Sequence, residues 1–458
     1  MARPIPKTLA ALAADLGSGK TTALALAEAC LARIADPEGE GRRTILQCDP
    51  KKVRAQAAAQ DALRAAGAAA SPLAGIPISV KDLFDVQGEV TKSGSRILDG
   101  APPATADAIA IARLRRAGAV IVGRTTMSEF AFSGLGINPH YGTPKNPYDR
   151  KTGRIPGGSS SGAAISVTDG MAHAGIGTDT GGSCRIPAAL TGVVGFKPTA
   201  RRVPLTGCMP LATSLDSIGP LARSVDCCAL IDALMAGEEP VALPGMPVRG
   251  LRLAVPGNVV LDHMDKDVAA AFQRALTALS KAGAAVSDVQ LPVLDKVPGL
   301  FAKGGIACAE AYAFHQAWLA EHGPGYDPRI RVRIELGREQ SAADYIGLLH
   351  LRAALGRELD TATAPYDAVL MPGVAIVAPP IAALDPKEPF ETYMRINGLI
   401  LRNTAIGNQM DRCSIAIPCH GPGEPPVGLM LVGERGADRR LLMHAKAVET
   451  ALAPIRLG

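Results

Sequence analysis

The chain has 458 residues, of which 47% are hydrophobic and 20% charged, and it carries a net charge of +5. This composition excludes an intrinsically disordered chain and is typical of a globular protein. The 48 basic and 43 acidic residues are interspersed, so nothing indicates binding to nucleic acid or to a membrane surface. The most apolar segment, 368–384, is interrupted by three prolines, so we expect no transmembrane helix.

The nine cysteines form no CxxC pair, which argues against a zinc site, and their odd number argues against a disulfide framework. We therefore expect free thiols in a reducing compartment. The N-terminal segment lacks the apolar core and the cleavage site of a secretory signal. The eight histidines are scattered, without the spacing of metal ligands. These features predict a cytoplasmic protein without a metal or a cofactor.

The first quarter of the chain alternates helices and strands. Hydrophobic periodicity predicts helices over 8–15, 21–35 and 53–66. A short apolar strand over 76–80 ends at Lys81, and a helix over 106–117 leads into a strand over 119–123. This alternation predicts an α/β fold.

The segment around Gly19 contains part of a P-loop motif. Gly19-Lys20-Thr21 resembles its end, but the glycine that the motif requires five residues earlier is replaced by Ala14. The segment before it is predicted to be helical, whereas a P-loop follows a strand. We therefore reject ATP binding and interpret the segment as the start of a helix.

The middle of the chain is rich in glycine and loops. A short helix is expected over 127–132, a polar loop over 138–156 and a helix over 161–170. Strands are expected over 172–177 and 190–198. We interpret 214–225 as loop and turn, and the Pro- and Gly-rich segment 237–249 as the best candidate for a linker.

The last part returns to strands and helices. Strands are predicted over 251–255, 285–289 and 368–376, with a helix over 266–282 between the first two. Helices over 301–322 and 334–361 are expected to cover the active-site face. A helix over 392–408 precedes two paired strands, 414–418 and 427–432, and a helix over 439–452 closes the chain.

Two glycine-flanked serines mark the candidate site. Ser159 lies in G-G-S-S-S-G at 157–162, and Ser183 lies in G-T-D-T-G-G-S-C-R-I-P at 177–187. Glycine beside a serine lets the backbone turn sharply and brings its N–H groups close to a ligand. A serine nucleophile with an oxyanion hole needs this arrangement.

Together with Lys81 in G-I-P-I-S-V-K-D, these motifs resemble the amidase signature family. The resemblance runs over about residues 9–452 and is strongest over 74–221. It implies hydrolysis of C–N bonds by a Ser–cis-Ser–Lys triad, with Ser183 as nucleophile, Ser159 as relay and Lys81 as base. It also implies a single domain over 1–458 around a large mixed sheet flanked by helices, with a catalytic core over about 74–221. A helical lid and substrate pocket are then expected over about 295–410.

The proposed chemistry requires a neutral lysine. A free lysine has a pKa near ~10.4, and burial at the end of an apolar strand lowers that pKa. Asp179 and Arg185 are expected to form a partly buried pair that shapes the loop, and Ser160 to support it. The oxyanion hole is expected from the backbone N–H groups of Thr180, Gly181, Gly182 and Ser183.

Two rival nucleophiles are rejected. Ser160 is central in a G-x-S-x-G match, but a nucleophile elbow follows a buried strand, and 149–154 does not resemble one. Cys184 has no paired base, and buried cysteines are ordinary core residues.

The resemblance implies that the substrate pocket is built by segments outside these motifs. Pocket residues are expected from segments 127–136, 201–209, 301–345 and 394–409, and we expect a small aryl or alkyl amide, with carbamates or esters as side substrates. The main alternative is the glutaminase (A) subunit of a tRNA-dependent amidotransferase, which would need partner subunits. A catalytically dead scaffold is a third hypothesis, and a stand-alone enzyme is expected to be a monomer or a homodimer. The specific candidates for the pocket are Met127, Phe130, Leu135 and Arg202.

Overall fold

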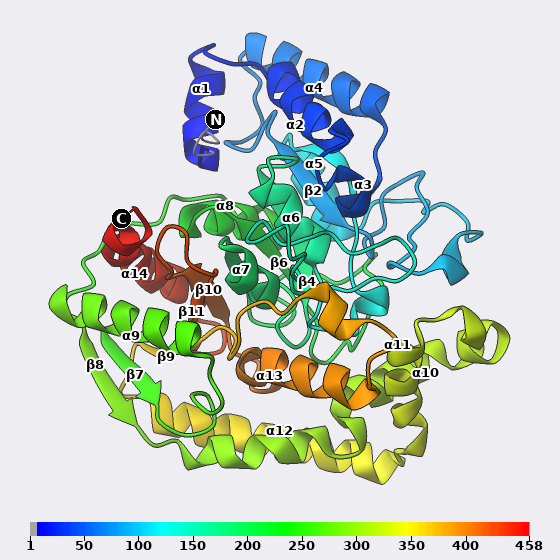
Figure 1. Ribbon diagram of the computed structural model, residues 1–458. Helices are drawn as coiled ribbons and strands as arrows, with labels where there is room; N and C mark the ends of the chain where they lie inside the picture. Colours follow the sequence, from blue (N-terminus) through cyan, green and yellow to red (C-terminus); the bar gives the residue numbers. More distant parts are fainter. Residues whose placement is uncertain (1–6, 458) are drawn as a thin grey trace.

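The strands of the computed structural model, which describes residues 7–457, join one 11-stranded mixed sheet (Figure 1). This confirms the predicted single-domain α/β fold. The pairs around β2 and around β7 are parallel, and the remaining pairs are antiparallel. In sheet order the strands are β1 (Ile45–Gln47), β3 (Val120–Thr125), β2 (Pro77–Lys81), β4 (Ala174–Asp179), β6 (Ser217–Ala222), β5 (Val194–Lys197), β10 (Ser414–Pro418), β11 (Gly428–Val432), β9 (Ala368–Pro372), β7 (Arg252–Pro256) and β8 (Ala285–Val289).

Helices cover both faces of the sheet. On one face α6 (Ser161–Thr168) and α7 (Arg185–Thr191) pack on the central strands, and α13 (Phe390–Gln409) packs on α7. On the other face α5 (Ile109–Arg116), α8 (Val225–Ala236), α9 (Lys266–Lys281) and α14 (Asp438–Leu457) enclose the larger apolar core. The remaining helices are α1 (Leu9–Gly17), α2 (Ala23–Ala35), α3 (Gly41–Thr44), α4 (Pro50–Ala65), α10 (Gly305–His322), α11 (Pro328–Glu335) and α12 (Ala342–Thr363).

The central strands are built from small residues because α6 and α7 lie directly on them. A Cβ atom on Gly175 of β4 would lie 2.7 Å from the carbonyl oxygen of Ala163 in α6. A Cβ atom on Gly195 of β5 would lie 2.4 Å from the carbonyl oxygen of Cys184. Real side chains do not approach so closely, so glycine is what allows these two helices to bring the serine loops onto the sheet.

Several segments differ from the prediction. The helix expected over 334–361 is interrupted, because a 3₁₀ turn (Leu336–Glu339) separates α11 from α12, and the strand expected over 368–376 ends at Pro372. Segment 214–225 was expected to be loop, but residues 217–222 form β6, which pairs with both β4 and β5. Its Gly219-Pro220 dipeptide favours a turn locally, and burial between two strands overrides that preference. Segment 127–132 holds only a 3₁₀ turn (Glu129–Ala131), because Phe130 has φ +48°. Part of the strand expected over 190–198 belongs to α7, and β5 begins at Val194.

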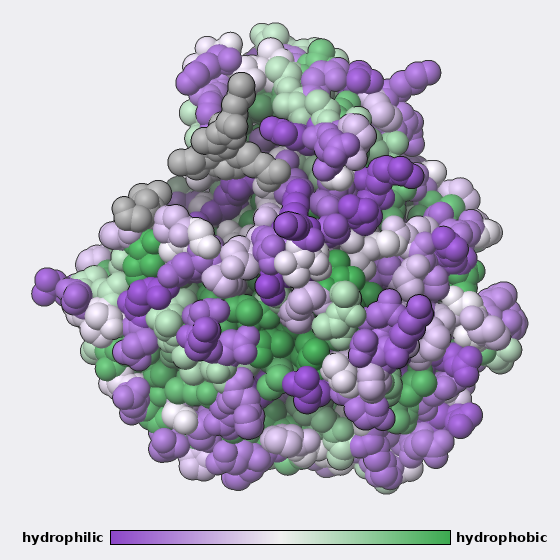
Figure 2. All heavy atoms as spheres, viewed as in Figure 1, coloured by the Kyte–Doolittle hydropathy of each residue, from purple (hydrophilic) through white to green (hydrophobic). Residues whose placement is uncertain are grey.

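The segment expected to be a linker, 237–249, connects α8 to β7. β7 belongs to the same sheet as the strands that precede the segment. Residues 1–6, which begin the segment considered for a secretory signal, lie outside the described residues. Within residues 7–457, no helix combines the length and the apolarity needed to cross a membrane. On the face shown in Figure 2, hydrophilic side chains predominate and apolar patches are interspersed among them.

Candidate active site

Lys81 is the last residue of β2 and is fully buried. Because β2 and β4 are parallel neighbours, their carboxyl ends meet at the same edge of the sheet. There the Nζ atom of Lys81 donates to Ser159 Oγ at 2.7 Å and to Thr178 Oγ1 at 2.8 Å. Burial lowers the pKa of Lys81 from 10.5 to about 8. The structure thus brings the predicted base and the predicted relay into direct contact.

In the loop before α6, Ser159 is followed by Ser160, which contacts the second serine loop. The Gly158–Ser159 peptide bond is cis. The N–H of Ser160 donates to the carbonyl oxygen of Ser183 at 3.3 Å, and Ser160 Oγ donates to the carbonyl oxygen of Thr178 at 3.2 Å. Ser160 therefore links the two serine loops to each other and to β4.

Asp179 and Arg185 form a fully buried ion pair at the end of β4. The Arg185 guanidinium donates to both carboxylate oxygens, at 2.9 and 3.1 Å, and Asn408 of α13 donates to Oδ1 at 2.8 Å. Burial alone would raise the pKa of Asp179, but the charge and hydrogen bonds of Arg185 hold it at about 2. The pair is deeper than the partly buried pair expected from the sequence.

The same carboxylate organises the loop that contains Ser183. The N–H groups of Gly182 and Cys184 donate to Asp179 at 2.8 and 3.0 Å. Gly182 was predicted as an oxyanion donor, but its N–H is occupied by this hydrogen bond. Three of the predicted donors have no protein acceptor within residues 7–457, namely the N–H groups of Thr180, Gly181 and Ser183.

Ser183 opens onto a cavity of about 100 Å³. Three of the four segments expected to build the pocket contribute to its wall, and so does the segment that contains Leu211 and Leu215. The wall consists of Ala131, Phe132, Ser133, Gly134, Thr180, Gly181, Ser183, Leu211, Leu215, Phe301, Gly304, Ala307, Cys308, Arg333, Leu401, Ala405 and Gln409.

Two larger polar side chains stand in this wall. Arg333 lies over the ring of Phe132, 4.3 Å from the guanidinium carbon to the ring centre, and also donates to the carbonyl oxygen of Phe132. It forms no ion pair with any described residue. Gln409 is buried, and its Oε1 atom has no hydrogen-bond partner among residues 7–457. Both side chains therefore keep hydrogen-bonding capacity for a ligand.

The four specific pocket candidates lie outside this wall. Met127 and Leu135 are fully buried core residues. Phe130 packs edge-on against His315, with ring centres 4.4 Å apart. Arg202 pairs with Asp232 at 2.9 Å and is therefore already neutralised. Apolar side chains at these positions find partners in the core, and for that reason residue type alone did not identify the pocket.

The sequence predicted the helix over 392–408 and the pocket segment 394–409, but not the polar contacts by which α13 (Phe390–Gln409) holds the site. Along one face of α13, Asn397 accepts from the N–H of Gly134 at 2.9 Å, and Thr404 Oγ1 donates to the carbonyl oxygen of Gly181 at 2.7 Å. Asn408 reaches Asp179, as described above. The positions 397, 404 and 408 are 7 and 4 residues apart, which is the spacing of one helical face. Polar residues at this spacing on a mostly buried helix were the available signal.

The rejected motifs have structural roles. Thr22 caps α2 by accepting the N–H of Ala25, so the P-loop-like segment is a helix start. Cys184 is buried, and burial raises the pKa of its thiol, which opposes a thiolate nucleophile.

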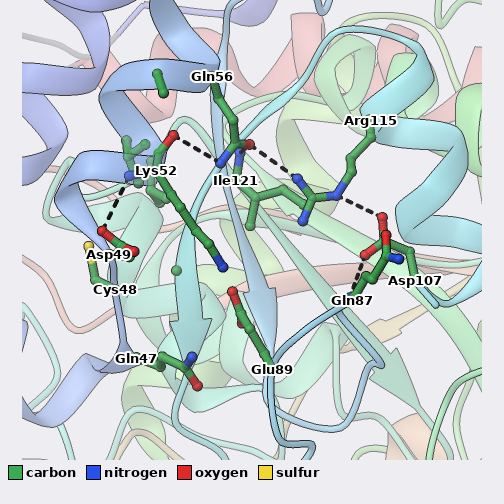
Figure 3. A pocket seen from close by; sticks show the side chains of 14 residues that line it. Gln47, Cys48, Asp49, Lys52, Gln56, Gln87, Glu89, Asp107, Arg115 and Ile121 are labelled. Carbon is green, nitrogen blue, oxygen red and sulfur yellow. Dashed lines mark hydrogen bonds and ion pairs between the residues drawn. The ribbon is translucent and has the colours of Figure 1, made fainter. Parts of the chain in front are cut away.

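A larger pocket of about 410 Å³ lies between α4, β3 and the loop that carries Glu89 (Figure 3). Arg115 pairs there with Asp107 at 2.7 Å. Lys52 of α4 and Glu89 point toward one another in the same pocket. Its wall contains none of the residues of the Ser183 cavity.

The comparisons with known proteins agree on the class of protein. A family model described as Amidase matches residues 25–442. The chain is 36% identical over 452 residues to 2-amino-5-chloromuconic acid deaminase of Comamonas testosteroni, covering 97% of this chain and 96% of that protein. It is 35% identical to the glutamyl-tRNA(Gln) amidotransferase (A) subunit of Roseiflexus sp. (strain RS-1), covering 94% and 93%. A crystal structure of an amidase superposes with a TM-score of 0.87 at 34% identity, covering 97% of this chain and 99% of that one.

The chain therefore belongs to the amidase family, as the motifs around Lys81, Ser159 and Ser183 indicated. It is an enzyme, a hydrolase that acts on amide C–N bonds.

Proposed function

We propose that the chain hydrolyses small, carboxylate-bearing amides through an acyl-Ser183 intermediate. The observation that carries the mechanism is the 2.7 Å hydrogen bond between the buried Lys81 and Ser159. Neutral Lys81 accepts a proton from Ser159 while Ser159 accepts one from Ser183, and Ser183 Oγ attacks the carbonyl carbon. The proton returns through Ser159 to the leaving amine, and water then cleaves the ester by the same proton path.

The tetrahedral intermediate carries its negative charge on the former carbonyl oxygen. We assign its donors to the N–H groups of Thr180, Gly181 and Ser183, because the N–H of Gly182 already binds Asp179. Each donor that is held in place before the reaction lowers the activation free energy by about 3 kcal/mol. The buried Asp179–Arg185 pair holds these donors in place, because Asp179 accepts from the N–H groups of Gly182 and Cys184 in the same loop.

The carboxylate preference rests on Arg333. Its guanidinium lies in the wall of the Ser183 cavity without an acidic partner among the described residues. A guanidinium fork matches a carboxylate, and a cavity wall of largely apolar residues strengthens such a pair. The buried, unpartnered Gln409 Oε1 adds an acceptor for a substrate N–H or O–H. A relative at 36% identity is named for an acid, 2-amino-5-chloromuconic acid, which supports a carboxylate-bearing substrate within the class of small aryl or alkyl amides expected from the sequence.

A second candidate is the glutaminase subunit of a tRNA-dependent amidotransferase. It is favoured by the relative from Roseiflexus, at 35% identity over most of both chains. Glutamine also carries a carboxylate, so Arg333 does not separate the two candidates. They differ in whether the chain acts alone. For a stand-alone amidase we propose a cytoplasmic monomer or homodimer without nucleic-acid partners, in keeping with its nine free cysteines.

The test is hydrolysis by the purified chain, with Ser183→Ala as the blank. The panel contains glutaramic acid and its neutral counterpart pentanamide, glutamine, an aryl anilide and an aryl carbamate. Turnover of glutaramic acid well above pentanamide supports the proposal, and a preference for pentanamide or the anilide contradicts it. Weak turnover of glutamine alone favours the amidotransferase subunit.

Arg333→Met tests the carboxylate contact directly. We expect KM for glutaramic acid to rise about tenfold or more, as for the loss of one charged hydrogen-bond partner, while kinetics with pentanamide change little. Arg338→Met is the matched control, because Arg338 is exposed on the neighbouring turn and is absent from the cavity wall. Equal effects of Arg333→Met on both substrates would contradict the assignment.

A further inference from the structure

Asp216 is a buried carboxylate that joins two walls of the Ser183 cavity. It lies immediately before β6, and only 5% of its surface is exposed. Its Oδ1 atom accepts from Thr180 Oγ1 at 2.5 Å, and its Oδ2 atom accepts from the N–H groups of Leu211 and Ala212 at 3.0 and 3.1 Å. Thr180, Leu211 and Leu215 all line the cavity. One side chain therefore joins the loop that contains Thr180 to the wall segment that contains Leu211 and Leu215.

We propose that Asp216 is a positioning residue for catalysis, and that its ionised carboxylate aligns the Thr180 peptide unit with the reacting oxygen. This inference rests on the proposed oxyanion hole. Thr180 is the first residue after β4, and its side chain anchors it to this wall of the cavity. A misplaced donor weakens stabilisation of the transition state without removing any group that binds the ground state.

The hydrogen bonds indicate which protonation state is competent. All three neighbours donate to Asp216, and Oδ2 is occupied by two backbone N–H groups that cannot become acceptors. A proton on the carboxyl group must therefore sit on Oδ1, where it reverses the bond to Thr180 and removes its charge assistance. Protonation of Asp216 should thus loosen Thr180 while the remainder of the site stays in place.

The charged surroundings of Asp216 set where this happens. Burial raises the pKa of Asp216 to about 6, and the nearby Glu310 of α10 acts in the same direction. Lys81 of β2 and Cys208 also lie close enough to Asp216 to interact with its charge. Activity is then expected to require two deprotonations, of Lys81 near pH 8 and of Asp216 near pH 6. The logarithm of kcat/KM should rise with a slope of one between pH 6 and 8. Below pH 6 the slope should approach two over about one to two pH units, because the form with protonated Asp216 keeps about a tenth to a hundredth of the activity.

The test compares Asp216→Asn with Asp438→Asn on glutaramic acid. Asp438 is the matched control: it is equally buried, and its carboxylate accepts from the N–H and the hydroxyl of Thr199, outside the cavity wall. Asp216→Asn should lower kcat by about tenfold to a hundredfold with KM within about threefold, and should leave a slope of one below about pH 6. Asp438→Asn should keep the wild-type kcat and both slopes.

Wild-type kcat, or a retained slope of two, in a folded Asp216→Asn protein would overturn the inference. If Asp216→Asn does not fold, Thr180→Val decides, because it removes only the hydroxyl that the carboxylate binds. It should show the same fall in kcat, and unchanged kcat would again overturn the inference. Absence of amidase activity in the wild type is a different outcome, because it would refute the proposed function itself.

Discussion

Lys81→Met is predicted to abolish activity and at the same time to stabilise the protein at neutral pH. Lys81 is fully buried, and its pKa falls from 10.5 in the unfolded chain to about 8 in the fold. This difference corresponds to about 3 kcal/mol of unfavourable free energy, because the folded environment disfavours the charged form. Methionine fills a similar volume without that cost. The variant loses the hydrogen bonds to Ser159 and Thr178, which each stabilise the folded state by about 1 kcal/mol. The net expectation is a gain of about 1 kcal/mol at neutral pH.

The pH dependence gives this prediction its sign. Below pH 8 both the folded and the unfolded wild type carry a protonated Lys81, so the penalty is fully present. Between pH 8 and 10.5 the unfolded chain binds the additional proton, and wild-type stability therefore rises with pH. The advantage of the Met variant should shrink by about 2 kcal/mol between about pH 7 and about pH 9.5 and change sign.

Urea unfolding at several pH values measures this difference, with Lys51→Met as the matched control. Lys51 is exposed on α4, so its replacement should give a stability difference that does not change over this pH range. A stability difference between wild type and Lys81→Met that is constant with pH would refute the argument that burial makes this lysine a base. So would a variant several kcal/mol less stable than wild type at neutral pH.

Two further substitutions test the loop around Ser183. Gly182→Ala should reduce kcat by more than about a hundredfold, because Gly182 has φ +134° and a Cβ atom would lie 2.1 Å from Thr404 Oγ1. Gly181→Ala, whose Cβ atom would lie 3.3 Å from its nearest neighbour, should lower the thermal stability less than Gly182→Ala does. Equal losses of thermal stability in the two variants would contradict the steric explanation. Arg185→Leu should destabilise the fold by about 3–5 kcal/mol in urea unfolding, because Asp179 remains buried without its charge partner. Removing the exposed Lys296 from its pair with Glu358 should cost under about 1 kcal/mol, and a similar cost for Arg185→Leu would show that the buried pair is dispensable.

The sequence by itself determined the parts of the enzyme that are local. Ser159 and Ser183 could be proposed as site residues because their glycines adjoin them in the chain, and the turn they need is a property of a few consecutive residues. Lys81 could be recognised because the apolar run that buries it directly precedes it. Most helices and strands were predictable for the same reason, since their periodicity is a property of consecutive residues.

Only the tertiary structure decided how these parts are held and what they bind. Asn408 meets Asp179 across 229 positions of the chain, and Thr404 meets Gly181 across 223. Arg333 and Gln409 come to the cavity from two different helices, and the apolar residues first expected there found partners in the core instead. β6 forms against its local turn preference because two neighbouring strands bury it. Contacts of this kind depend on how layers pack, so the sequence indicated three of the segments that share the cavity wall but not which of their side chains face the cavity.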